Sequence, residues 1–217
     1  LRALRDLDDH VAESAAFALS SAGVGAGFVS NADHEFRAAV WTNGATTLVL
    51  PLPGDEHSVA TAIDDALGAA GASFTLGDVS AHGFLSDGAS TIDLGSFVPR
   101  AMNASGAMAG AVTALEGLES VRRPALRSGG LTIILPTLSG FGGQALDLNA
   151  SGWIVGESVD PQRRVRAALW RSGAISDLGT LGGPRAWAHA INGAGLVAGA
   201  SETAAGDIHA TLTTLGA

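Results

Sequence analysis

The chain has 217 residues, of which 47% are hydrophobic and 15% are charged, and this composition excludes a disordered chain. The 21 acidic residues outnumber the 12 basic ones, and the net charge of -9 disfavours nucleic acid and anionic membranes as partners. No apolar run reaches the roughly 18 residues that cross a bilayer, and the absence of Cys excludes disulfides and thiolate metal sites. We therefore expect a soluble protein without a membrane span, or a mature chain whose leader has been removed.

One sequence element occurs five times along the chain. Its clearest copy is AHAINGAGLVAGAS, from Ala188 to Ser201, and the other copies begin at Ala16, Ala60, Arg100 and Leu146. The later glycine of each copy defines the period, with spacings of 44, 39, 46 and 43 residues between Gly27, Gly71, Gly110, Gly156 and Gly199. A period of this length is typical of one four-stranded blade of a β-propeller.

Each copy is followed by two more strand-like runs, such as RAALW from Arg166 and GAISDLGTL from Gly173. The four runs of a unit alternate apolar and polar residues and show no helical period. Asx-type side chains are expected to close the first hairpin of each unit; they are Asn103, Asn149 and Asn192, with Ser20 and Asp64 at the same position. Trp41 and Trp170 share one position of the third strand, where we expect both to be core residues.

These observations predict an all-β chain that forms one domain, a five-bladed β-propeller with four-stranded antiparallel blades. The expected blades cover residues 10–54, 55–98, 99–140, 141–183 and 184–217. The fifth copy breaks off at Ala217, and Leu1 to Leu7 continue its pattern. We therefore expect residues 1–9 to complete the last blade, to close the ring and to leave a monomer without an open sheet edge.

The string HAxLWxxGxxxDLGTLGGxxxxAxAINxxGxVxGxS resembles the bacterial HAF repeat, a probable extracellular repeat, and Ala167 to Ser201 carry most of it. The match is close in the fourth and fifth copies, looser in the first, and weak in the second and third, which lack the Trp of the third strand. The resemblance implies a propeller-like repeat fold and an extracellular or periplasmic location. Its motif residues are structural, so it implies no activity.

Polar residues that break the repeat are the candidates for function, because the repeated residues are Gly, Ala, Leu and turn Asn. No GxSxG, HExxH, phosphate-binding loop or EF-hand loop occurs in the chain. Each unit supplies one polar residue at or near its first strand, namely Glu13, His57, Arg100, Asp147 and His189. In a ring these residues would meet at the axis. Asp147 replaces an Ala of the other copies, and a carboxylate there must meet water, a donor or a cation.

Two functions fit this arrangement. In the first, which we favour, Glu13, Asp147 and Asp9 bind one axial Ca2+, and His57, Asp147, His189 and Arg100 hydrolyse a small ester or lactone. In the alternative, the chain is a non-catalytic extracellular module that binds a carbohydrate or another small ligand. Trp187 and Phe97 are candidates for the apolar wall of a ligand pocket.

Overall fold

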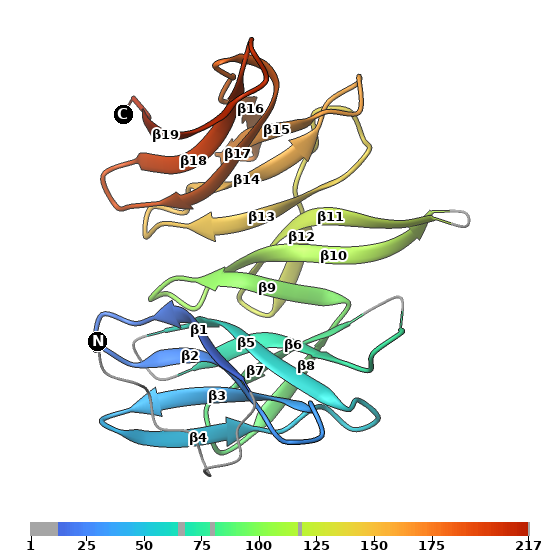
Figure 1. Cartoon of the computed structure of the whole chain (residues 1–217), viewed down its shortest axis with the longest axis vertical. Helices are drawn as coiled ribbons and strands as arrows, with labels where there is room; N and C mark the ends of the chain where they lie inside the picture. The colour runs from blue at the N-terminus through green and yellow to red at the C-terminus, as the bar shows by residue number, and fades with distance from the viewer. Residues whose placement is uncertain (1–12, 65–67, 79–80, 117–118, 217) are drawn as a thin grey trace. The chain divides into compact units, whose positions relative to one another are not determined.

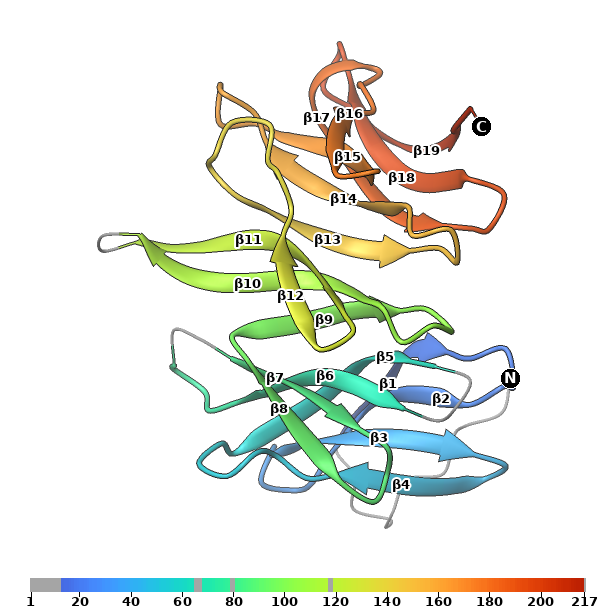
Figure 2. The same ribbon diagram turned by 180° about the vertical axis from the view of Figure 1, so that it is seen from behind.

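The computed structural model describes residues 13–64, 68–78, 81–116 and 119–216. These residues form 19 strands in five separate antiparallel sheets of three or four strands (Figures 1 and 2). The all-β class and the repetition of similar sheets agree with the prediction. The chain divides into two compact units, Leu1–Ala104 and Ser105–Ala217. The described part of the chain contains no helix with the length and apolarity to cross a membrane.

The prediction of a closed five-bladed propeller is wrong. The sheets are separate, and none of them is closed or curled into a ring. The fifth sheet has three described strands, and residues 1–9, which were expected to complete it, lie outside the described residues. The length of the period fixes how many strands one repeat can form, whereas the closing of a ring depends on the rotation from one sheet to the next. The repeated Gly, Ala and Leu residues carry no readable information on that rotation.

The first unit contains two four-stranded sheets, each with its strands in chain order, and the strand β9 (Phe97–Met102), which packs against β5, β6 and β7. The strands of the two sheets are β1 (Ser14–Leu19), β2 (Gly25–Ser30), β3 (Phe36–Thr42), β4 (Ala45–Val49), β5 (His57–Ile63), β6 (Ala69–Phe74), β7 (His82–Ser86) and β8 (Thr91–Gly95). Their shared core includes Val24, Val40 and the fully buried Phe84.

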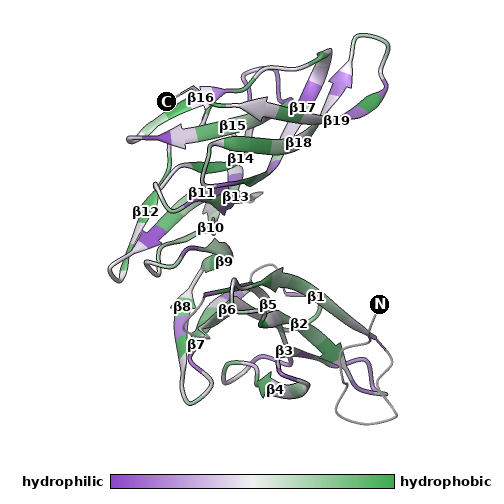
Figure 3. Ribbon diagram, turned by 90° about the vertical axis from the view of Figure 1, so that its left-hand side faces the viewer, coloured by the Kyte–Doolittle hydropathy of each residue, from purple (hydrophilic) through white to green (hydrophobic). Residues whose placement is uncertain are grey.

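The second unit begins with β10 (Met108–Glu116), β11 (Glu119–Ser128) and β12 (Leu131–Ile134). The fourth sheet follows with β13 (Gly143–Leu148), β14 (Ile154–Val159), β15 (Val165–Arg171) and β16 (Ala174–Asp177), and the fifth sheet contains β17 (Gly182–Ile191), β18 (Leu196–Thr203) and β19 (Ile208–Thr214). Val155, Leu169 and Val197 belong to the core that these two sheets share. Apolar stretches along β15 and β18 are visible in Figure 3.

A β-bulge recurs in the first strand of four sheets and explains the repeated glycine. The pairing register shifts at aligned positions of β1, β5, β13 and β17. Opposite each bulge lies a glycine of the second strand, and a Cβ there would overlap a carbonyl oxygen of the bulged strand. The glycines are Gly27, Gly71, Gly156 and Gly199. The repeat therefore keeps Gly at this position because the bulge brings two backbones too close for any side chain.

The first hairpin of four repeats is closed by a side chain, as the sequence predicts, and Ser20 and Asp64 serve the first two sheets. Asn149 Oδ1 accepts hydrogen bonds from the N–H groups of Ser151 and Trp153, both at 3.0 Å. Asn192 forms the same turn in the fifth sheet, where the N–H of Leu196 lies 2.9 Å from its Oδ1. The glycine of the fifth-sheet turn, Gly195, has a φ of +77°. Asn149 and Asn192 are therefore turn residues, as expected.

A buried serine links the second strand of three sheets to the loop that precedes its sheet. Ser73 Oγ accepts a hydrogen bond from the N–H of Leu52 at 2.8 Å. The equivalent bonds run from Leu138 to Ser158 at 3.0 Å and from Leu181 to Ser201 at 2.8 Å. This serine belongs to the repeat, because in these copies it follows the repeated glycine by two positions, and it is the last residue of the repeated element as quoted above.

Candidate functional site

The fourth and fifth sheets can be compared residue by residue at a constant offset of 43 positions. Gly156 pairs with Ala168 in the fourth sheet, and Gly199 pairs with Thr211 in the fifth. The bonds that hold the preceding loop also correspond, because Leu135 donates its N–H to the Pro124 carbonyl at 2.8 Å and Leu178 donates to Ala167 at 2.9 Å. The two sheets therefore share most of their backbone pairing, and they differ mainly in the side chains at equivalent positions.

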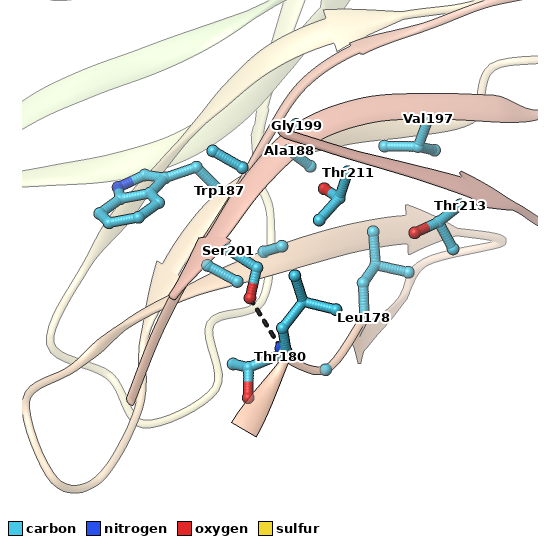
Figure 4. A pocket seen from close by; sticks show the side chains of 14 residues that line it. Leu178, Thr180, Trp187, Ala188, Val197, Gly199, Ser201, Thr211 and Thr213 are labelled. Atoms are coloured by element: carbon cyan, nitrogen blue, oxygen red, sulfur yellow. Dashed lines mark hydrogen bonds between the residues drawn. The ribbon is translucent and has the colours of Figure 1, made fainter. Parts of the chain in front are cut away.

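A pocket lies between the loop after β16 and the face of the fifth sheet. Its volume is about 100 Å³, and it is open to solvent on one side. Figure 4 shows Leu178, Thr211 and Thr213 around it, with the Trp187 ring to one side. The lining residues come from one loop and the strands β15, β17, β18 and β19: Ala167, Leu178, Gly179, Thr180, Leu181, Ala186, Trp187, Ala188, Val197, Gly199, Ala200, Ser201, Thr211 and Thr213. We call this space the β16–β19 pocket.

The pocket lies where the fourth sheet holds an indole ring. Trp170 pairs with Ile154 in the fourth sheet, and the equivalent Thr213 pairs with Val197 in the fifth. The Trp170 ring is buried, with 2% of the residue exposed, and its Nε1–H donates to the Pro136 carbonyl at 2.7 Å. Thr213 removes most of that volume, and the loop that covers Trp170 has its counterpart in the loop at Gly179. The fifth sheet is thus left with a space that its neighbour fills.

Apolar surface and hydroxyl groups dominate the walls of the pocket. Leu178 and Val197 supply methyl groups, and Thr180, Thr211 and Thr213 supply hydroxyls. No described lining residue has an ionisable side chain. Such a wall can hold a ligand by contact and by a few hydrogen bonds, as small-molecule sites do.

An ion pair lies next to Trp187. Arg185 Nε lies 2.9 Å from Glu202 Oε2, and the Arg185 guanidinium lies 5.7 Å from the centre of the Trp187 ring. Glu202 is buried, so this pair positions the cation next to the indole. Trp187 does line a pocket, as the sequence suggested, whereas Phe97 is buried in the first unit.

His57, an expected catalytic residue, is bound into the core of the first unit. Its Nδ1 accepts a hydrogen bond from the N–H of Phe36 at 3.1 Å. The imidazole lies between the rings of Phe36 and Phe74, with both centroids at 5.4 Å. A nitrogen that accepts a backbone N–H is not available as a general base. The environment of His57 is therefore that of a structural histidine.

Asp147, expected both as a catalytic residue and as a calcium ligand, binds backbone N–H groups. Its Oδ2 accepts from Ile191 at 2.7 Å and its Oδ1 from Leu148 at 2.8 Å. Burial raises the pKa of the Asp147 carboxyl, while the two N–H groups act in the opposite direction. The carboxylate therefore has the hydrogen-bond donors that its position requires. Its bond to Ile191 joins β13 of the fourth sheet to β17 of the fifth sheet.

The other described residues of the predicted site lie on strands or directly before one. Arg100 and His189 are exposed, and Glu13 is exposed with its N–H bonded to Ser30 Oγ at 3.0 Å. Asp9 lies outside the described residues. Within the described ranges no three His, Asp or Glu side chains are grouped as a metal site requires.

A different acid and imidazole do come together in the first unit. Asp55 Oδ2 lies 3.1 Å from His82 Nδ1, and the Asp55 side chain is only 7% exposed. The contact ties the loop before β5 to the start of β7.

Sequence comparison adds no family assignment, since no family model matches the chain and no curated protein is recognisably similar to it.

Proposed function

We propose that the chain is a non-catalytic binding module that holds a small, largely apolar molecule in the β16–β19 pocket. The observation that carries this proposal is Thr213, which stands where the equivalent strand of the fourth sheet has the buried Trp170. A chain that fills this position in one sheet and leaves it hollow in the next, with hydroxyls around the hollow, has the surface that a small ligand needs.

The chemistry of the described residues favours binding over hydrolysis. The pocket has hydroxyls and a backbone loop but no described acid, base or imidazole in its wall. The two side chains most central to the hydrolase hypothesis, His57 and Asp147, both accept backbone N–H groups. The resemblance to the HAF repeat, whose motif residues are structural, indicates no particular activity and is compatible with this proposal.

A filled pocket provides the test. The double variant Thr211→Ala, Thr213→Trp restores the side chains that the fourth sheet has at Ala168 and Trp170. We expect it to lose the binding of mono- and bicyclic aromatic fragments, measured by saturation-transfer NMR, and to melt at a higher temperature because the cavity is filled.

Thr214→Trp is the matched control, because Thr214 is exposed and points to the opposite face of β19. It should bind the fragments as the native chain does. Equal fragment binding by the double variant and the native chain would show that the β16–β19 pocket is not the site.

A further inference from the structure

We propose further that the ligand of the β16–β19 pocket is a planar bicyclic aromatic molecule with a ring N–H, that is, an indole-type compound. This inference rests on the proposed function and names its ligand class. The juxtaposition that supports it is the indole of Trp170 beside the Pro136 carbonyl, at the position in the fourth sheet that corresponds to the pocket in the fifth.

The shape of the pocket follows from its equivalent in the fourth sheet. There, Trp170 lies over a strand that carries Ile154 and Gly156, and its neighbour two positions earlier is the fully buried Ala168. The fifth sheet retains the small residue at Gly199 and has Val197 beside it. At Gly199 the Trp187 carbonyl oxygen of the bulged strand takes the space of a Cβ, so no side chain of β18 projects there. A wall without a projecting side chain accepts a planar ring lying against it.

The polar requirement also follows from the fourth sheet. Trp170 is held by a hydrogen bond as well as by packing, since its Nε1–H donates to the Pro136 carbonyl in the covering loop. The corresponding loop of the fifth sheet is held at both sides by the same bonds, from the N–H of Leu178 to Ala167 and from the N–H of Leu181 to Ser201. The loop of residues 178–181 therefore lies on the same side of the space.

One residue of that loop differs between the two sheets. Gly179 has a φ of +84°, which the equivalent Pro136 cannot adopt, so the direction of this single carbonyl is set differently. The hydroxyls of Thr211 and Thr213 add acceptors that the fourth sheet lacks at Ala168 and Trp170, and the loop supplies a further hydroxyl at Thr180, as it does at Thr137 in the fourth sheet. A ring N–H in the pocket thus meets acceptors on two sides. A ligand without a donor would leave them unpaired at a cost in affinity.

Three small probes separate the parts of this inference when each is titrated into the 15N-labelled full chain. Indole carries both rings and the N–H, 1-methylindole lacks the donor, and pyrrole lacks the second ring. We expect indole to shift the amide resonances of Gly179, Thr211 and Thr213. We expect 1-methylindole and pyrrole each to bind about tenfold more weakly, because each loses one hydrogen bond or one ring of contact area. The double variant Thr211→Ala, Thr213→Trp should show no shifts, and Thr214→Trp should behave as the native chain.

Each outcome has one meaning. Equal affinity of 1-methylindole and indole overturns the role of the N–H, and equal affinity of pyrrole and indole overturns the bicyclic shape; in both cases the proposed binding function stands. If other aromatic fragments bind at the pocket and indole does not, the ligand class is wrong while the function again stands. If neither indole nor any fragment shifts the pocket resonances, both proposals fall.

Discussion

Replacing Gly156 by Ala should destabilise the chain strongly, although alanine is the smallest side chain. Gly156 lies opposite the bulge of β13, and its new Cβ would overlap the Gln144 carbonyl oxygen and come within 3.0 Å of Ala145 Cα and Leu146 N. All three atoms belong to the backbone, so no side-chain rotation relieves the contact. The two strands would have to separate by roughly 1 Å, which lengthens their hydrogen bonds beyond the useful range.

We expect a loss of about 3 kcal/mol in the free energy of unfolding, at the upper end of the cost of overpacking and against a small entropic gain from removing a glycine. For a chain of this size that loss corresponds to a melting temperature lower by about 6–12 °C. Thermal unfolding followed by circular dichroism measures it. Gly193→Ala is the matched control, because a Cβ at Gly193 meets nothing within 4 Å. It should melt at the native temperature or slightly above. A Gly156→Ala variant within about 0.5 kcal/mol of the native chain would refute the steric explanation of the repeated glycine.

Three further substitutions test other contacts of the second unit. Burial raises the pKa of the Asp147 carboxyl, so its contribution to stability is present at low pH and lost as the pH rises through that pKa; the melting temperature of Asp147→Asn minus that of the native chain should therefore increase from about pH 3.5 to about pH 7. Ser158→Ala leaves the buried N–H of Leu138 without its acceptor, and we expect a loss of about 1–2 kcal/mol in urea unfolding. Trp170→Thr copies the fifth sheet into the fourth; it should cost about 3–5 kcal/mol and be partly rescued by added indole, and a variant that indole does not stabilise counts against the equivalence of the two positions.

Local structure was predictable from the sequence wherever one short-range cause determines it. The hairpin turns at Asn149 and Asn192 follow from an Asx side chain and a nearby glycine with positive φ, and both are present. The burial of Trp41 and Trp170 follows from their shared position in the third strand, and both are core residues. Ring closure did not follow, because it depends on angles between sheets that no short motif determines.

Of the candidate site only Trp187 was named from the sequence, because polar residues were sought where a charged residue breaks the repeat. Asp147 was such a break, and the structure gives it two backbone donors. The pocket instead arises from a loss of volume at Thr213, a neutral residue in the copy that otherwise matches the repeat closely. Comparison of Thr213 with Trp170 and Trp41 was the signal available in the sequence. The replacement of Trp by Thr creates a pocket only because the loop at Gly179 covers this position, and that arrangement is visible only in the structure.

The constant offset of 43 positions between the fourth and fifth sheets has a consequence for how such a chain can change over generations. Recombination between the two segments, at any pair of equivalent codons, would join one backbone to the other without a frame or register error. Each repeat can therefore be copied, lost or exchanged as a whole, while single substitutions such as the one at residue 213 accumulate in one repeat only. A redundant core position in a duplicated unit is free to diverge, and a chain built in this way can acquire a new recognition surface without redesigning its scaffold.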